Sequence, residues 1–585
     1  MSDPGIESNH IGNGCLREDP LKIEECDDTR VEVSYKPKER KAPCIAGEGD
    51  ISKSRLVAGV TVFAVVILIL FVALLLNVYA VKTECQSSSV TNSLLGDQSP
   101  PDRPPHIVFI MVDNLGTNDV GWNNPNIKTP ILNSLAVDGV ILSNFYSQPS
   151  ATASRAAFLT GRYPFKLGYQ RDYEDGVPRE GLPRDNVILP RILKQMGYST
   201  HVIGKWDLGW CDLEDTPLHR GFDSFYGYYM NNISPMNHSY RDPVTELEGI
   251  NLFDNTGVVS YEKGTFLFDL FEKRLGNIIE NISPQNPLFL MISIDSMLSS
   301  NDVKFTFLKI PQRFQETYDG VEDRTQRTRY AAISALDELV GNLKSHLESS
   351  GLWEETVLVF ASNNGVDVNL KDDESTSTVN INGEYLSERR TRVPAFSHGK
   401  MMNKTGYVNK ELVHVIDWAP TLVSIAGRHS SNYTFDGLDL SETLIQGLSS
   451  PRHSFIYNIL SQNPIVAAVR HGDYKLTENQ ASSPIVMEHL EDKGTNRTET
   501  DDADTTSQYT ANQRTSLNTN AKYLYNIAND PLEESNLAES QPEKVNELHK
   551  RLMSSIEHIK DAIPLANDGD LRKSFKNGVW IPGRC

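Results

Sequence analysis

The sequence predicts an α/β fold in which helices flank a large, mixed but mostly parallel sheet. It also predicts a small C-terminal antiparallel sheet with a helix. A single transmembrane helix is predicted near the N-terminus. Short apolar runs, typical of strands buried on both faces, alternate with helical patterns, and this alternation indicates a parallel sheet. The runs are Ile107–Val112, Thr200–Ile203, Leu288–Ile294 and Val357–Ala361, and the helical patterns are Thr129–Val137, Ser154–Thr160, Leu189–Met196 and Arg327–Glu348.

The pattern changes near residue 450. Short strand-like runs then predominate, at His453–Leu460, Ile465–Arg470, Tyr474–Leu476 and Lys522–Asn526. A helix is predicted over Pro542–Ile563, with a proline in its first turn and another just past its end. The stretch 478–519, rich in Thr, Asn, Asp and Ser, predicts a flexible insertion in the small sheet.

An apolar segment, Leu56–Val81, precedes the folded part. As a helix it spans about 39 Å, enough to cross a hydrocarbon layer of about 30 Å with some tilt. A cleaved signal peptide is the competing interpretation, but the run is long, lies well inside the chain and has no clear cleavage site after it. Only Lys82 follows the segment closely, whereas six basic residues precede it: Lys36, Lys38, Arg40, Lys41, Lys53 and Arg55. The excess of positive charge before the segment predicts a cytosolic amino terminus.

This topology divides the 585 residues into five parts. We expect a disordered cytosolic tail (1–55), a signal-anchor helix (56–81), a stalk (82–104), an α/β domain (105–450) and a C-terminal subdomain (451–585). The folded part would be lumenal or extracellular in the secretory pathway or at the cell surface. All glycosylation triplets lie on that side, at Asn232, Asn237, Asn281, Asn403, Asn432 and Asn496.

Net charge and cysteines limit the partners. A net charge of −21 argues against non-specific binding of nucleic acid. Cys85, Cys211 and Cys585 would face an oxidising compartment, and an odd number leaves at least one free or paired with another chain. Cys85, in the stalk, could form a disulfide-linked dimer. An intrachain bond, either Cys211–Cys585 or Cys85–Cys585, is the alternative.

The stretch from Gln148 to Pro164, QPSATASRAAFLTGRYP, resembles the sulfatase signature Cys-x-Pro-Ser-Arg-x-x-x-Leu-Thr-Gly-Arg. Other framework stretches match in the expected order, among them Asn-Asp-Val-Gly-Trp, Gly-Lys-Trp and Arg-Gly-Phe-Asp-Ser-Phe-Tyr-Gly-Tyr. The resemblance covers about residues 104–565 and looks closest to the arylsulfatase B-like branch, within the wider alkaline phosphatase superfamily. It implies the fold of a calcium-dependent sulfuric ester hydrolase.

The position that performs the chemistry differs. The family oxidises its signature cysteine to formylglycine, whose hydrated aldehyde is the nucleophile. Ala151 occupies that position and Ala153 replaces the following proline. An alanine methyl group cannot be converted in this way, so no formylglycine is expected. Ser150 and Thr152 flank Ala151, and related hydrolases of the superfamily use a serine or threonine as nucleophile. A one-residue shift at a helix start, however, turns a side chain by about 100° and moves it off the site.

The resemblance also implies a degenerate calcium site at Asp113, Asn114, Asn363 and Asn364, where three carboxylates have become one. Because calcium affinity depends on ligand charge, we expect possible but weak binding. The favoured alternative is that these side chains only cap turns and form local hydrogen bonds.

Five further positions complete the comparison. Arg155 and Lys205 match basic residues that hold formylglycine and sulfate. They either retain anion binding or are structural, with Arg155 paired to Asp113. Asp207 and Leu298 stand at the two histidine positions, and a family lysine aligns near Gly383, before Ser387–Arg390. Losing a general acid alone costs about 10²–10⁴-fold in rate.

The leading hypothesis is a membrane-anchored, sulfatase-like protein that is catalytically inactive and binds a sulfated glycan or a protein partner. The alternative is an active arylsulfatase-type hydrolase with calcium and an unorthodox site. A purely structural role, with the old pocket filled, is the third interpretation.

Overall fold

The computed structural model describes residues 103–171, 177–231, 233–243, 245–283, 285–295, 310–365, 385–462, 464–479 and 521–585. All of these belong to the second of two compact units, 1–98 and 99–585. The predicted tail and transmembrane segment therefore lie outside the described residues. Within the described ranges, no helix combines the length and apolar character needed to cross a bilayer.

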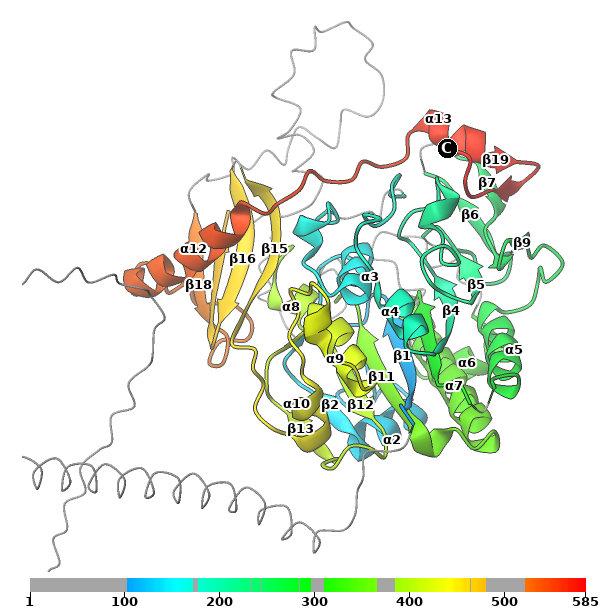
Figure 1. The fold of residues 1–585 in the computed structure, drawn as a ribbon, viewed down its shortest axis with the longest axis horizontal. Coiled ribbons are helices and arrows are strands. Elements are labelled where there is room, and N and C mark those ends of the chain that lie inside the picture. Colours follow the sequence, from blue (N-terminus) through cyan, green and yellow to red (C-terminus); the bar gives the residue numbers. More distant parts are fainter. Residues whose placement is uncertain are drawn as a thin grey trace, which may run out of the picture. The chain divides into compact units, whose positions relative to one another are not determined.

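A ten-stranded sheet forms the centre of the folded unit (Figure 1). Its five middle strands run parallel, whereas antiparallel neighbours occur towards both edges. In spatial order the strands are β13 (Tyr407–Asn409), β2 (Val140–Leu142), β12 (Ala395–His398), β11 (Thr356–Ser362), β1 (His106–Val112), β10 (Leu288–Ile294), β4 (Ser199–Lys205), β5 (Ser224–Tyr228), β8 (Phe253–Asp254) and β9 (Gly257–Val258). The predicted mixed, mostly parallel sheet is confirmed.

Helices cover both faces of this sheet (Figure 1). Alternate residues of β1 point to opposite faces, as the twofold period of a strand requires. Phe109 packs in one hydrophobic core with α3 (Ala151–Thr160), α4 (Leu189–Gln195) and α9 (Trp418–Ile425). Ile110 packs in the other with the second set of helices: α2 (Pro130–Asp138), α5 (Leu267–Glu280) and α7 (Arg324–Ser349). Burial on both faces explains why the strand is a continuous apolar run.

Short elements fill the connections. The short helices are α6 (Gln312–Gln315), α8 (Glu388–Thr391), α10 (Ser441–Gln446) and α13 (Asp568–Ser574). Two strands, β3 (Phe145–Tyr146) and β14 (Val413–His414), form a small parallel pair. A further four-stranded sheet has the order β19 (Phe575–Lys576), β20 (Val579–Trp580), β7 (Glu248–Ile250) and β6 (Ser239–Arg241).

The small antiparallel sheet predicted after residue 450 is present. Its strands are β15 (Ser454–Gln462), β16 (Ile465–His471), β17 (Tyr474–Glu478) and β18 (Lys522–Asn526). Leu548 and Leu552 of α12 (Pro542–Ile556) are buried against its apolar face. Strand β17 is two residues longer than predicted, so Glu478, where we placed the start of the insertion, pairs with Lys522. The rest of the predicted insertion lies outside the described residues, apart from Asn479.

The predicted helix Pro542–Ile563 is wrong at its end, because α12 stops at Ile556. Tertiary hydrogen bonds draw the following backbone away from helical geometry. The N–H groups of Lys560 and Ile563 donate to the carbonyls of Phe165 and Gly168, each at 2.8 Å. The chain then runs across the top of the view in Figure 1 to α13. Cys211 and the last residue, Cys585, form a disulfide there, which is one of the intrachain alternatives.

Asp337 of α7 gives the fold a measurable pH dependence. Its buried carboxylate accepts hydrogen bonds from the first-turn N–H groups of α2, at 3.2 Å from Ile131 and 2.7 Å from Leu132. Burial raises the pKa of Asp337 to about 6, from an ordinary value of 3.8. Its stabilising contribution is therefore complete below about pH 4 and is lost as the pH rises through about 6. The shift corresponds to about 3 kcal/mol.

Asp337→Asn removes this titration and leaves one amide oxygen to accept a helix N–H. From about pH 4 to pH 7, the wild type should lose about 3 kcal/mol of unfolding free energy relative to the variant, because only the wild type ionises at this position. Chemical denaturation at both pH values measures the difference. Asp319→Asn, at an exposed turn, controls for the substitution itself. A wild-type-to-variant difference that stays constant with pH would contradict this assignment.

Candidate functional site

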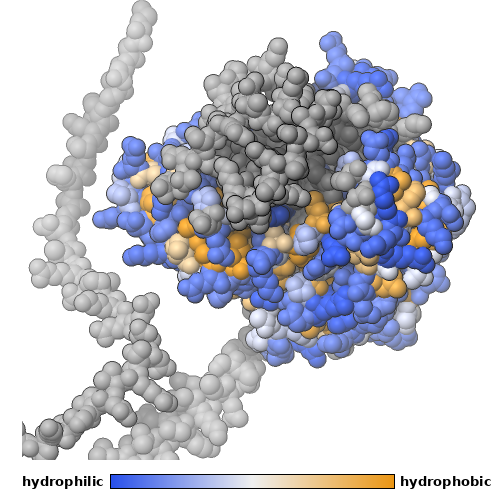
Figure 2. All heavy atoms as spheres, turned by 90° about the horizontal axis from the view of Figure 1, so that it is seen from above, coloured by the Kyte–Doolittle hydropathy of each residue, from blue (hydrophilic) through white to orange (hydrophobic). Residues whose placement is uncertain are grey.

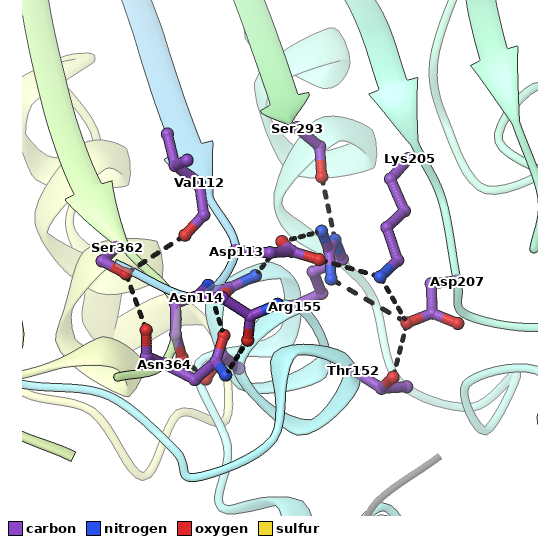
Figure 3. Close-up of polar contacts among 12 residues, drawn as sticks. Val112, Asp113, Asn114, Thr152, Arg155, Lys205, Asp207, Ser293, Ser362 and Asn364 are labelled. Carbon is purple, nitrogen blue, oxygen red and sulfur yellow. Dashed lines mark hydrogen bonds and ion pairs between the residues drawn. The ribbon is translucent and has the colours of Figure 1, made fainter. Parts of the chain in front are cut away.

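Four neighbouring parallel strands bring the predicted site residues to one edge of the large sheet (Figure 3). Val112, at the end of β1, pairs with Ile294 of β10 on one side and with Ser362 of β11 on the other. Asp113 and Asn363 therefore follow adjacent strands at the same level, and the N–H of Asn363 donates to the carbonyl of Val112 at 2.9 Å. Lys205 ends β4, one strand beyond β10.

Helix α3 delivers the signature region to this edge. The helix begins at Ala151, three residues before its predicted start, after an extended Ser150. Ala151 is half-buried in the first turn, where it presents only a methyl group. Thr152 and Arg155, on the same helix, are buried and reach the strand ends. The helix that begins at Ala151 thus contacts Asp113 through Arg155 and Asp207 through Thr152.

Asp113, Arg155, Lys205 and Asp207 form a buried group of two carboxylates and two cations, which we call the charge quartet. Arg155 Nη2 donates to Asp113 Oδ1, and Lys205 Nζ lies 2.8 Å from Asp113 Oδ2. Asp207 Oδ2 lies 3.8 Å from both Arg155 Nη1 and Lys205 Nζ. The formal charge is zero, and no member is more than 5% exposed.

Two hydroxyl groups complete the contacts of the charge quartet. Arg155 Nε donates to Ser293 Oγ at 2.8 Å, and Thr152 Oγ1 donates to Asp207 Oδ2 at 2.5 Å (Figure 3). Asp207 adopts the left-handed backbone region, with φ of 57°, which costs a non-glycine residue energy. The surrounding contacts hold it there. Sequence reasoning missed Ser293, whose only signal is a hydroxyl inside the apolar run Leu288–Ile294.

The pKa directions follow from burial and from the opposed charges. Burial would raise the pKa of Asp113, but Arg155 and Lys205 outweigh it and hold the pKa below its ordinary value. Burial would lower the pKa values of Arg155 and Lys205, but Asp113 and Asp207 raise both. The pKa of Asp207 is raised, because burial outweighs its more distant cations. Asp113 is therefore the better neutralised carboxylate.

The three asparagines bond across the ends of two neighbouring strands, β1 and β11. Asn363 Nδ2 donates to Asp113 Oδ1 at 2.6 Å. Asn364 accepts from the backbone N–H of Asn114 at 3.0 Å and returns a hydrogen bond to the Asn114 side-chain oxygen at 2.6 Å. This exchange holds Asn114 in the left-handed region, with φ of 55°. These contacts join residues 250 apart in the sequence and connect the ends of β1 and β11, whereas the predicted alternative is turn capping and local hydrogen bonds.

The donor set does not fit a calcium ion. Donors from Arg155, Asn363 and Lys205 already occupy both oxygens of Asp113. A divalent cation at Asp113 would meet the two positive charges that already contact this carboxylate, whereas calcium requires an oxygen-rich, negatively charged cage. Among the described residues, no group of three or more His, Cys, Asp or Glu side chains is placed to hold a metal ion.

Several buried atoms around the charge quartet have no hydrogen-bond partner. They include Asp207 Oδ1 and Asn363 Oδ1, which only accept, and Arg155 Nη1, which only donates. A sulfate group needs several donors. Three of the atoms without partners are acceptors, namely Asp207 Oδ1, Asn363 Oδ1 and Gln148 Oε1, whereas the hydroxyl of Ser150 can donate or accept.

Of the remaining positions in the family comparison, the structure describes only the Ser387–Arg390 stretch. Leu298 and Gly383 lie outside the described residues, so their alignments stay predictions. Glu388, within the Ser387–Arg390 stretch, is buried and accepts from the hydroxyls of Tyr146, at 2.8 Å, and Tyr457. It thereby holds α8 against the small sheet.

Four of the glycosylation triplets are described, and all four asparagines are exposed: Asn237, Asn281, Asn403 and Asn432. Asn232 and Asn496 lie outside the described part of the chain. Exposure is required for modification, so these four positions remain candidates for glycosylation.

The fold and the motifs around this edge identify the class of protein. Residues 105–428 match the Sulfatase family model, and the chain belongs to the sulfatase family. It is 31% identical to arylsulfatase J from Mus musculus over 506 residues, which are 82% of this chain and 80% of the relative. It is also 29% identical to arylsulfatase A from Homo sapiens, over 74% of this chain and 83% of the relative.

Solved structures share the fold. The crystal structure of Ps i-CgsB in complex with k-i-k-neocarrahexaose gives a TM-score of 0.64 at 20% identity, covering 80% of this chain and 97% of that one. The PsFucS1 sulfatase from Pseudoalteromonas sp. gives a TM-score of 0.56 at 22% identity, covering 80% and 92%. At these identities the likeness concerns the fold alone.

Proposed function

We propose that this chain is a membrane-anchored member of the sulfatase family that has no sulfatase activity and acts by binding a glycan or protein partner. The observation that carries the proposal is the closed charge quartet beside Ala151. Sulfate ester hydrolysis needs a nucleophile, a proton donor for the leaving group and positive charge around the sulfate. Here the nucleophile position carries a methyl group, and both cations are already paired.

These losses reinforce one another. A nucleophile and its acid/base partner act as a unit, so removing either one abolishes most of the rate enhancement. Asp207, at the position of one family histidine, is fully buried and engages Thr152 and the two cations. It has no open side from which to protonate a leaving group.

One observation favours an unorthodox hydrolase as a second candidate. Thr152 donates to Asp207, whose raised pKa suits a general base, and two cations lie nearby. Against this, Thr152 is only 2% exposed and Asp207 is 0% exposed, so a substrate would have to open the helix start. The inactive protein is therefore the better-supported candidate.

Turnover of a generic aryl sulfate by the purified full-length chain tests the proposal. We expect no hydrolysis above background, in calcium or in chelator, under conditions in which human arylsulfatase A is active. A rate that disappears in Thr152→Ala but survives in Thr117→Ala, an exposed control, would establish the unorthodox hydrolase and overturn the proposal.

Charge and surface character bear on the partner. The net charge of −21 and the engaged cations favour a protein or a weakly charged glycan over a highly sulfated polymer. In Figure 2 hydrophobic residues gather in patches on an otherwise hydrophilic upper face. Large contiguous apolar patches mark interaction sites on soluble proteins. Tyr261 and Leu532, 79% and 71% exposed, are further apolar side chains open to a partner.

The anchor and the cysteines complete the proposal. The basic flank before Leu56 and the exposed glycosylation triplets support a type II topology with a lumenal or extracellular folded part. The Cys211–Cys585 bond leaves Cys85 as the remaining cysteine after the predicted span, which supports a dimer linked through Cys85. Non-reducing electrophoresis should show a dimer that Cys85→Ser removes, and a monomeric wild type would exclude this linkage.

A further inference from the structure

We infer that the charge quartet takes the place of a bound metal ion: Arg155 and Lys205 neutralise Asp113, Asp207 balances the second cation, and the sheet edge is held together without metal. The inference uses the same residues as the proposed function, but its test is independent of turnover. It gives the four side chains of the charge quartet a structural role, which is to stabilise this end of the sheet.

The contacts of Asp113 support the first part. An ion would hold a carboxylate by direct contact with its oxygens, and here protein donors make that contact. Arg155 and Asn363 donate to Oδ1, and Lys205 donates to Oδ2 at 2.8 Å. These donors come from α3, from the residue after β11 and from the end of β4. The carboxylate at the end of β1 thus joins three other elements.

Charge balance supports the second part. Asp113 alone against Arg155 and Lys205 would leave a net charge of +1 at a place where every participant is buried. An uncompensated buried charge is strongly destabilising. Asp207 offsets this charge, since its Oδ2 is equidistant from the two cations at 3.8 Å, and the buried carboxylate of Asp295 adds negative charge near Lys205. Asp207 is thus a balancing residue for the group, held in position by the hydrogen bond from Thr152.

Connectivity supports the third part. Ser293 extends the group to β10, through the Arg155 Nε contact at 2.8 Å. Four consecutive strands of the parallel core, β11, β1, β10 and β4, are therefore tied at their carboxyl ends to the start of α3. These side-chain contacts add to the backbone hydrogen bonds that continue past the strand ends, from the N–H groups of Asp113 and Asn363 to the carbonyls of the last residues of β10 and β1, respectively, each at 2.9 Å.

Calcium titration of the full-length chain tests the inference. We expect the same melting temperature in millimolar calcium and in chelator, and no saturable heat in isothermal titration with calcium. One saturable ion per chain, accompanied by a calcium-dependent rise of several degrees that Asp113→Asn abolishes, would overturn it. Both measurements use the wild type, so they do not depend on whether a variant folds.

A charge variant tests the balancing role. Asp207→Asn should lower the melting temperature by several degrees, equally in calcium and in chelator. Asp212→Asn, which breaks a pair with Arg184 on the exposed part of the same loop, is the matched control and should change it little. A wild-type melting temperature in Asp207→Asn would overturn the balancing role.

The two proposals can fail separately. Aryl sulfate turnover without calcium binding would refute the proposed function and leave this inference standing. Calcium binding without turnover would refute this inference and leave the proposed function standing.

Discussion

Asp113→Asn is expected to lower the free energy of unfolding by about 3–5 kcal/mol, the cost typical of removing one partner from a buried ion pair. The substitution leaves Arg155 and Lys205 buried, with Asp207 at 3.8 Å from each and the buried carboxylate of Asp295 near Lys205. Both cations then lose the carboxylate that they contact directly, in a buried environment. An exposed ion pair would contribute no more than about 1 kcal/mol, so the size of the effect distinguishes a buried ion pair from an exposed one.

Denaturant unfolding of the wild type and of a double-mutant cycle measures this effect. Arg155→Met alone should also destabilise the fold, whereas combining it with Asp113→Asn should cost less than the sum of the two, because both partners of the pair are then gone. Asp212→Asn again serves as the exposed control. An Asp113→Asn variant within about 1 kcal/mol of the wild type would show that the pair carries little stability.

Ala151→Cys is expected to leave aryl sulfate turnover at background, even when the new cysteine is oxidised to formylglycine. The restored nucleophile would still lack an acid/base partner, because the resemblance to the family aligns Asp207 with a histidine. That loss alone costs about 10²–10⁴-fold. Arg155 and Lys205 would also remain on Asp113 and would not turn to a sulfate group.

The experiment requires expression in cells that carry out the oxidation, with mass spectrometry to show that position 151 has been converted. The same cells should yield active human arylsulfatase A as a positive control. Ala153→Cys, at 0% exposure in the same helix, controls for the introduction of a thiol. Robust turnover in Ala151→Cys alone would show that Asp207 and Leu298 do not stand at the acid/base positions.

Much of the large sheet could be predicted from local pattern. Leu288–Ile294 and Lys522–Asn526 have the predicted bounds, and β1 differs by one residue. These segments are buried on both faces or end at clear polar residues, so their bounds can be predicted from the residue pattern. The end of α12 could not be predicted, because its termination depends on hydrogen bonds to Phe165 and Gly168, nearly four hundred residues earlier in the chain.

The site divides in the same way. The motifs identified which residues would converge and left two interpretations of Arg155: anion binding, or pairing with Asp113. The pairing is the one that the structure contains. The contact of Thr152 with Asp207 could not be foreseen, because it depends on the left-handed backbone of Asp207 and on the start of α3 at Ala151. Pattern identifies the strands, but the distances between strand ends exist only in the fold.

The central claim is that this edge of the sheet is closed by its own charges and accepts neither sulfate nor calcium. The most direct measurement is a crystallographic difference map of the protein soaked in both ions. The account predicts Arg155 and Lys205 on Asp113, with no ion density in contact with any of the three. A sulfate seated on Arg155 and Lys205, or a calcium ion on the Asp113 carboxylate, would contradict it.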